Sequence, residues 1–140
     1  MQGVNVASSD LSNYVFSGDL DHTFLQTSYG KNLSFCLKMF DIFLASIEED
    51  MSSLNRSVTD GDFDEVESLA HKIKNNFTWV GLPTMSQYMY DLENVARLKN
   101  VDDMQQCMSN LKLSYEDKFQ VVRTERERLS NYLSLSLIHI

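Results

Sequence analysis

The sequence predicts an all-α protein, an antiparallel up-down-up-down four-helix bundle with a short extra N-terminal helix. Glycine is scarce, with five in 140 residues, and Pro83 is the single proline, whereas β proteins need many turns. Apolar residues recur at helical spacing along most of the chain. Because the length suits one domain with one core, we expect these amphipathic segments to pack together.

The N-terminal segment, residues 1–19, is polar and rich in serine and asparagine, and we expect it to be poorly ordered. A short helix is predicted over residues 20–29, ended by Gly30. The bundle should occupy residues 20–133, followed by a tail at 134–140. This apolar tail has three open interpretations: it extends the last helix, covers the end of the bundle, or is partly vector-derived.

The strongest periodic segment follows, with apolar residues alternately four and three positions apart over nearly four heptads. They are Leu33, Leu37, Phe40, Leu44, Ile47, Met51, Leu54 and Val58. Asn32 is a suitable N-cap for this helix. Gly61 suits the turn that ends it, and Asp62 can cap the next helix.

Three further segments complete the bundle. One helix should span about 63–80 and break at Gly81, after which Thr84 and Gln87 match a capping box for the next helix. The last segment lacks proline and glycine, so it predicts one or two long helices. We expect residues 124–128, with their alternating charges, to be a solvated face.

His71 stands out because it lies off the apolar stripe of its own helix. Residues three and four apart share a helical face, and the neighbours of His71 by that rule are all polar. They are Glu67, Ser68, Lys74, Asn75 and Thr78. The imidazole should therefore face solvent on a rigid helix. Imidazole is a nucleophile and a general base near neutral pH.

The charge of the chain narrows the classes of partner. A net charge of -8 argues against nucleic acid, which needs a basic surface, and against anionic membrane surfaces. No apolar run approaches the roughly 20 residues of a transmembrane helix, and no signal peptide is recognisable. We expect a cytoplasmic monomer whose partners are proteins.

Other chemical motifs are weak or missing. Cys36 and Cys107 lie at or beside apolar helical positions outside any CxxC pair, which predicts buried reduced thiols. His22 and His139 have no supporting motif, so the histidines predict no metal site. The acidic cluster 60–64 lacks the glycine and glutamate spacing of a calcium loop. There is no nucleotide-binding or nucleophile-elbow motif, so no cofactor is expected.

Residues 70–74 resemble the signature of histidine-containing phosphotransfer (HPt) domains of multistep two-component signalling. That signature reads A-H-x-[LI]-K-G, with a small residue seven positions and a glycine ten positions after the histidine. This chain has Ala-His-Lys-Ile-Lys, and Gly81 is ten after His71. The acidic turn 60–62 and the Leu92-Glu93 pair are also typical of the family. The likeness covers roughly residues 20–130.

The resemblance implies a relay in which His71 takes a phosphoryl group from a receiver aspartate and passes it to another receiver. Such domains have no kinase or nucleotide-binding activity of their own, and the Mg²⁺ belongs to the receiver. Lys74, one turn on, is expected to neutralise phosphoryl charge. Lys72 lies about 100° away around the helix. Partner contacts are expected at Glu67, Ser68, Lys72, Asn75 and Thr78, and the partners are receiver domains or a hybrid sensor kinase.

The chain departs from the family pattern beside the histidine. Asn75 stands where the family has glycine, and Thr78 holds the small-residue position. Phe77 and Trp79 replace residues that are often small; we expect both to pack in or at the end of the bundle, with an aromatic docking patch as the alternative. Three functions stay open: a phosphotransfer protein, a non-transferring adaptor that binds a receiver or kinase, and an unrelated interaction bundle.

Overall fold

The computed structural model describes residues 13–138 and the side chains of 13–136. Five α-helices are present in that part of the chain, and no strands: α2 (His22–Tyr29), α3 (Leu33–Asp60), α4 (Phe63–Trp79), α5 (Pro83–Arg97) and α6 (Val101–Ile138). The all-α prediction is confirmed.

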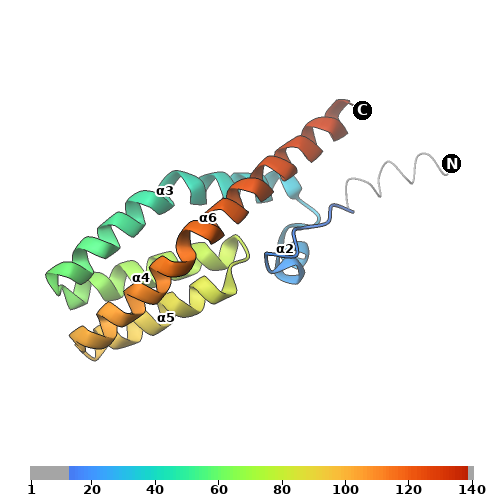
Figure 1. Cartoon of the computed structure of the whole chain (residues 1–140). Helices are drawn as coiled ribbons and strands as arrows, with labels where there is room; N and C mark the ends of the chain where they lie inside the picture. The colour runs from blue at the N-terminus through green and yellow to red at the C-terminus, as the bar shows by residue number, and fades with distance from the viewer. Residues whose placement is uncertain (1–12, 139–140) are drawn as a thin grey trace.

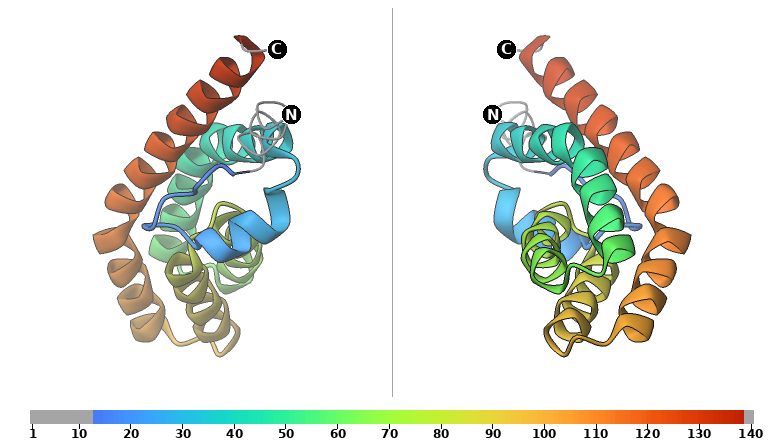
Figure 2. Two further views of the ribbon diagram at one scale, coloured as in Figure 1. Left: turned by 90° about the vertical axis from the view of Figure 1, so that its right-hand side faces the viewer. Right: turned by 90° about the vertical axis from the view of Figure 1, so that its left-hand side faces the viewer.

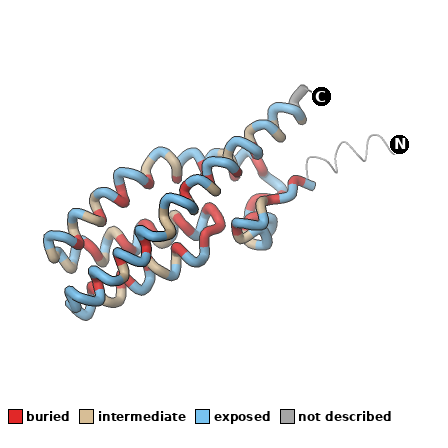
Figure 3. Tube along the Cα trace, viewed as in Figure 1, coloured by how far each residue is buried: buried red, intermediate tan, exposed pale blue. Residues whose placement is uncertain are grey.

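The four long helices form the predicted bundle (Figure 1). Helix α4 packs against α3 and α5, and α6 closes the bundle by packing against the same two helices. This arrangement puts α4 diagonally opposite α6. The buried residues line the inside of the bundle, while exposed residues cover its outside (Figure 3).

The predicted caps of α3 and α4 are confirmed. The Asn32 side chain accepts a hydrogen bond from the Phe35 amide at 3.1 Å, and Asp62 accepts one from the Glu65 amide at 3.2 Å. Gly61, between the two helices, has φ 68°, in the left-handed region that favours glycine. These local signals end α3 and begin α4 within two residues.

The predicted capping box of α5 is wrong. Leu82 occupies the N-cap position without a side-chain cap bond, and Pro83 is the first helical residue. Proline is favoured there because its fixed φ suits the helix and its missing N–H needs no partner. The helix therefore begins one residue before the capping position predicted for Thr84.

Helix α2 crosses the end of the bundle beside the turn that joins α4 to α5 (Figure 2). The Asp21 amide donates to the Gly81 carbonyl at 2.8 Å. Gly81 has φ 79°, and a Cβ at this position would lie 2.9 Å from Leu25 Cδ1. Both conditions favour glycine, so Gly81 permits the chain before α3 to lie directly on this turn.

The described residues that precede α2 are ordered, although the segment 1–19 was predicted to be poorly ordered. Tyr14 and Phe16 are buried, and residues 13–19 lie along α6; residues 1–12 are outside the described part of the chain. The Tyr14 hydroxyl and the Ser17 amide both donate to Glu125, each at 3.1 Å. We call residues 13–20 the N-terminal strap.

Glu125 also corrects the prediction of a fully solvated face over residues 124–128. Its side chain is 1% exposed, and Arg128 forms an ion pair with it. Arg128 additionally donates to the Val15 carbonyl at 3.1 Å. The charged segment 124–128 therefore includes one buried carboxylate, that of Glu125. The N-terminal strap donates the hydrogen bonds that this carboxylate needs in a buried position.

The last segment forms one long helix, one of the two predicted outcomes, and α6 continues into the predicted tail as far as Ile138. Its C-terminal end projects past the other helices (Figure 1). Of the three interpretations of the tail, the structure agrees with extension of the last helix. The predicted boundaries at 19 and 133 do not separate structural units, since the strap and the end of α6 are continuous with the bundle.

Candidate functional site

His71 lies on the outer surface of α4, near the middle of the helix, as the helical spacing predicts. Its side chain is 60% exposed. The core side of α4 is formed by its buried residues Val66, Ala70, Ile73 and Phe77. The spacing of these residues, at three and four positions, turns His71 outward.

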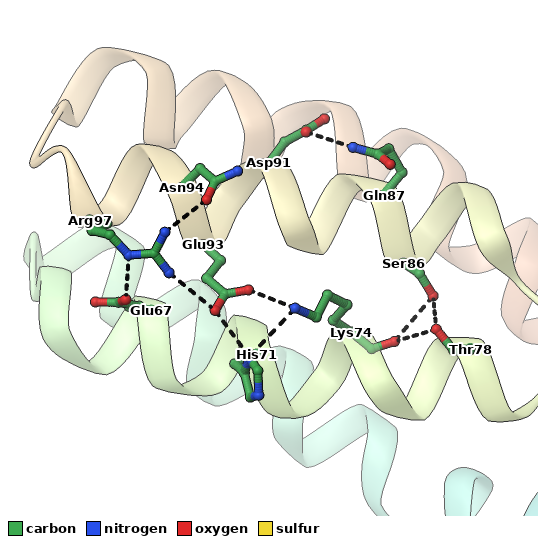
Figure 4. A network of polar contacts seen from close by, with 10 residues as sticks. All are labelled: Glu67, His71, Lys74, Thr78, Ser86, Gln87, Asp91, Glu93, Asn94 and Arg97. Atoms are coloured by element: carbon green, nitrogen blue, oxygen red, sulfur yellow. Dashed lines mark hydrogen bonds and ion pairs between the residues drawn. The ribbon is translucent and has the colours of Figure 1, made fainter.

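One nitrogen of the imidazole is held by the neighbouring helix. His71 Nδ1 lies 3.0 Å from Glu93 Oε2 on α5, whose side chain is only 9% exposed. An ionised carboxylate only accepts hydrogen bonds, so Nδ1 carries the proton. In the neutral imidazole Nε2 then keeps its lone pair, and Figure 4 shows this nitrogen pointing away from the network.

Glu93 is the centre of the polar network in Figure 4. Lys74 Nζ lies 3.0 Å from its Oε1, and Arg97 Nη2 lies 3.4 Å from its Oε2. Burial raises the pKa of Glu93, but the hydrogen bonds and charges of Lys74 and His71 outweigh it and lower the pKa below 4.5. Glu93 is therefore ionised at neutral pH and fixes the tautomer of His71.

Lys74 lies beside the imidazole as predicted, but its ammonium is already engaged. Besides its ion pair with Glu93, Nζ is 3.5 Å from His71 Nδ1 and 5.4 Å from the centre of the Tyr90 ring. Its side chain is 22% exposed. The positive charge is thus held next to the imidazole by contacts with two α5 residues.

Four other predicted site residues lie on the same side of α4 as His71. Glu67 joins the His71 network indirectly, through Arg97 Nε at 2.9 Å, while Ser68 and Asn75 are exposed on the same face. Thr78 donates to the Lys74 carbonyl at 3.2 Å and contacts Ser86 Oγ at 2.8 Å.

Lys72 points away from His71. Its ammonium contacts Asp50 Oδ1 on α3 at 3.1 Å. This contact agrees with the angular separation of about 100° between consecutive helical residues. The structure therefore places Lys72 between α3 and α4, whereas Lys74 lies between α4 and α5.

Two of the network's central residues, Glu93 and Arg97, were not among the predicted site residues. The sequence does contain a signal for Glu93, because this glutamate lies on the apolar stripe of its helix. It is four positions after the buried Met89 and one after the buried Leu92. A carboxylate on an apolar stripe needs polar partners on the neighbouring helix. Arg97 carries no comparable signal, since an exposed arginine near a helix end is common.

The structure places the two aromatic residues, Phe77 and Trp79, in different environments. Phe77 is buried and packs against Phe43, with ring centres 5.7 Å apart. Trp79 ends α4 with 45% of its surface exposed. The packing prediction is confirmed for Phe77, whereas Trp79 presents its side chain to solvent.

The thiols fit the predicted reduced state. Both cysteines are free; Cys36 is buried and Cys107 half-buried. Burial raises the pKa of Cys36 to about 12, so its reactive thiolate is scarce at neutral pH. No cluster of three or more potential metal ligands occurs in residues 13–136.

A family model for the Hpt domain matches residues 38–131, and the chain belongs to this family. The match includes His71 and its whole network, as well as most of the bundle. The match supports a histidine phosphotransfer role in two-component signalling, the process in which Hpt domains interact with receiver domains and kinases. No curated protein and no solved structure matches the chain.

Among the helices described, none is long and apolar enough to cross a membrane.

Proposed function

We propose that the chain is a phosphorelay intermediate that accepts a phosphoryl group on His71 from a receiver aspartate and passes it to another receiver. The observation that carries this proposal is the asymmetry of the imidazole. Nδ1 is held by Glu93 at 3.0 Å, while the ring is 60% exposed. One nitrogen is therefore oriented and the other is available to a partner.

The proposed reaction is an in-line displacement at phosphorus. The lone pair of His71 Nε2 attacks the phosphorus of the aspartyl phosphate, and an N–P bond forms. The bond from phosphorus to the aspartate oxygen breaks, and the carboxylate leaves with its electron pair. The next receiver reverses these steps with its own aspartate. Mg²⁺ is expected in the receiver, and no cofactor is proposed for this chain.

Glu93 and Lys74 act on the imidazole in this reaction. Positive charge develops on the ring as Nε2 becomes bonded to phosphorus, and the Glu93 carboxylate stabilises that charge through Nδ1–H. Lys74 neutralises part of the phosphoryl charge from its position beside the ring. Neither residue forms a covalent bond to phosphorus.

The surrounding polar face is the proposed contact surface for the receiver. Ser68 and Asn75 are exposed near His71, and Glu67 and Thr78 lie on the same side of α4. Lys72 forms a second contact region toward α3, where Asp50 holds its ammonium. We further propose that the protein acts as a monomer in the cytoplasm, with receivers or a hybrid sensor kinase as partners.

A non-transferring adaptor is the second candidate function. The exposed side chain of Asn75, one turn from His71, favours it, because this side chain occupies space that an approaching receiver needs. The adaptor shares the docking step of the relay but lacks the chemical step. The third interpretation, an unrelated bundle, is excluded because the chain belongs to the Hpt domain family.

A transfer assay separates the two candidates. A panel of receiver domains is phosphorylated with acetyl phosphate and Mg²⁺, mixed with the protein, and the modified residue is located by peptide mapping. The relay predicts modification of His71 and none in His71→Gln. His22→Gln is the matched control, because His22 is an exposed histidine outside the network. Receiver binding without modification would support the adaptor instead.

A further inference from the structure

Trp79 is an exposed aromatic residue on the same helix as His71. It ends α4 with 45% of its surface in solvent, and it is the only tryptophan of the chain. Its backbone carbonyl accepts a hydrogen bond from the buried Tyr29 hydroxyl at 2.9 Å. This bond fixes the end of α4 and thereby the place from which the indole projects.

The side of α4 on which Trp79 lies follows from Lys72. The two residues are seven apart, so they share a helical face, and Lys72 reaches Asp50 on α3. Trp79 therefore projects along the outer boundary between α3 and α4. This is the side of His71 opposite to the Glu93 network, which lies between α4 and α5.

Helix α3 adds further exposed apolar surface at the same boundary. Lys72 contacts Asp50 and Phe77 contacts Phe43, which fixes the antiparallel register of the two helices. The same register puts Ile42 level with Trp79. Ile42 is 55% exposed, and Phe35, also exposed, lies seven residues earlier on the same face of α3. We call Phe35, Ile42 and Trp79 the α3–α4 apolar rim.

The distance from Trp79 to His71 determines which partner covers this rim. Eight helical residues correspond to about 12 Å along the axis. A standard interface buries about 800 Å² on each partner, equivalent to a circle with a radius of about 16 Å. A receiver centred on His71 therefore covers Trp79 as well. Tryptophan is also among the residues that contribute most to binding at protein interfaces.

We infer that Trp79, with Ile42 beside it, is a specificity-determining contact for the receiver that exchanges phosphoryl groups with His71. This inference rests on the proposed function. The indole needs an apolar recess on the receiver at a fixed distance from its aspartate. Receivers that have this recess bind, and receivers with a charged or filled surface at that point are disfavoured by desolvation or by steric overlap.

Fluorescence tests this contact directly, since the indole of Trp79 is the sole tryptophan signal. A tryptophan-free receiver domain that transfers to His71 is titrated into the protein. Burial of the indole should shift its emission to shorter wavelength, with saturation at the concentration that also saturates transfer. An unchanged emission spectrum at saturating receiver would overturn the inference.

Kinetics provide the second test. Trp79→Ala should raise the KM for the phosphorylated receiver about tenfold or more, and Ile42→Ser should raise it less. The transfer rate at saturating receiver, and the modification of His71 by the small donor phosphoramidate, should stay unchanged. Leu113→Ala is the matched control, because Leu113 is 85% exposed on α6, diagonally opposite α4.

The outcomes separate this inference from the proposed function. If no receiver modifies His71, the relay itself fails. If receivers modify His71 and Trp79→Ala leaves the KM unchanged for all of them, the relay stands and the role of Trp79 is wrong. Circular dichroism of each variant confirms that the helical bundle is retained.

Discussion

Glu93 accepts a hydrogen bond from His71 Nδ1 at 3.0 Å across the boundary between α4 and α5. The carboxylate belongs to the buried side of α5, whereas the imidazole belongs to the exposed side of α4. A buried charge thus orients an exposed nucleophile. The same carboxylate holds Lys74, so one residue organises both groups that the proposed reaction uses.

Glu93 should make stability depend on pH in the acidic range. Its pKa is lowered in the fold, so it stabilises the protein fully above the ordinary value of 4.5. That contribution is lost as the pH falls through the lowered value. Chemical unfolding should show wild type more stable than Glu93→Gln by about 1–3 kcal/mol at pH 7. This difference in the free energy of unfolding should shrink below pH 4.5. A difference that does not depend on pH would contradict the ionised state of Glu93 in the fold.

Lys74→Ala should slow transfer, because it removes the nearest positive charge from the phosphoryl group. A charge-assisted contact is worth about 1.5–3 kcal/mol, which corresponds to a decrease of about 10- to 150-fold if the contact forms only in the transition state. Single-turnover transfer from a phosphorylated receiver measures the effect. Lys112→Ala is the matched control, since Lys112 is exposed on α6, diagonally opposite α4. Equal rates for wild type and Lys74→Ala would remove Lys74 from the mechanism.

Asn75→Gly should raise the rate of transfer while lowering stability. Removal of an exposed side chain one turn from His71 opens the approach of the receiver. Glycine in a helix interior costs up to about 1 kcal/mol of folding free energy. Transfer kinetics and urea unfolding measure the two effects on the same sample. A lower rate would instead indicate that Asn75 positions the imidazole or the phosphoryl group.

Glu125→Ala should release the N-terminal strap from α6. The variant leaves the buried Tyr14 hydroxyl and the Ser17 amide without their acceptor, and the expected loss of stability is about 1–3 kcal/mol. Hydrogen exchange over residues 13–20 should accelerate. Glu127→Ala is the control, because its side chain is 69% exposed. Unchanged exchange in Glu125→Ala would show that packing of Tyr14 and Phe16 alone holds the strap.

Helical periodicity and capping chemistry were sufficient to predict most of the fold. The caps at Asn32 and Asp62 and the turn at Gly61 depend on neighbouring residues, so the sequence shows them directly. The strap was missed because its order depends on a contact between Tyr14 and Glu125, 111 residues apart. No local pattern reports such a pairing.

Only part of the site was predicted, because local sequence patterns do not show contacts between different helices. The exposure of His71 and the proximity of Lys74 follow from positions within one helix. The role of Glu93 depends on how α5 packs against α4, which periodicity does not specify. Three carboxylates on apolar stripes, Asp50, Glu93 and Glu125, are buried against basic residues, so a carboxylate at a core position is the signal to seek.

The nitrogen that carries the phosphoryl group tests the central claim most directly. The protein is labelled with a nitrogen isotope, phosphorylated by a receiver, and examined by NMR for phosphorus–nitrogen coupling in His71. Because Glu93 holds Nδ1–H, we predict coupling to Nε2, with the Nδ1 proton retained. Phosphorus on Nδ1 of His71, or on another residue, would contradict the account.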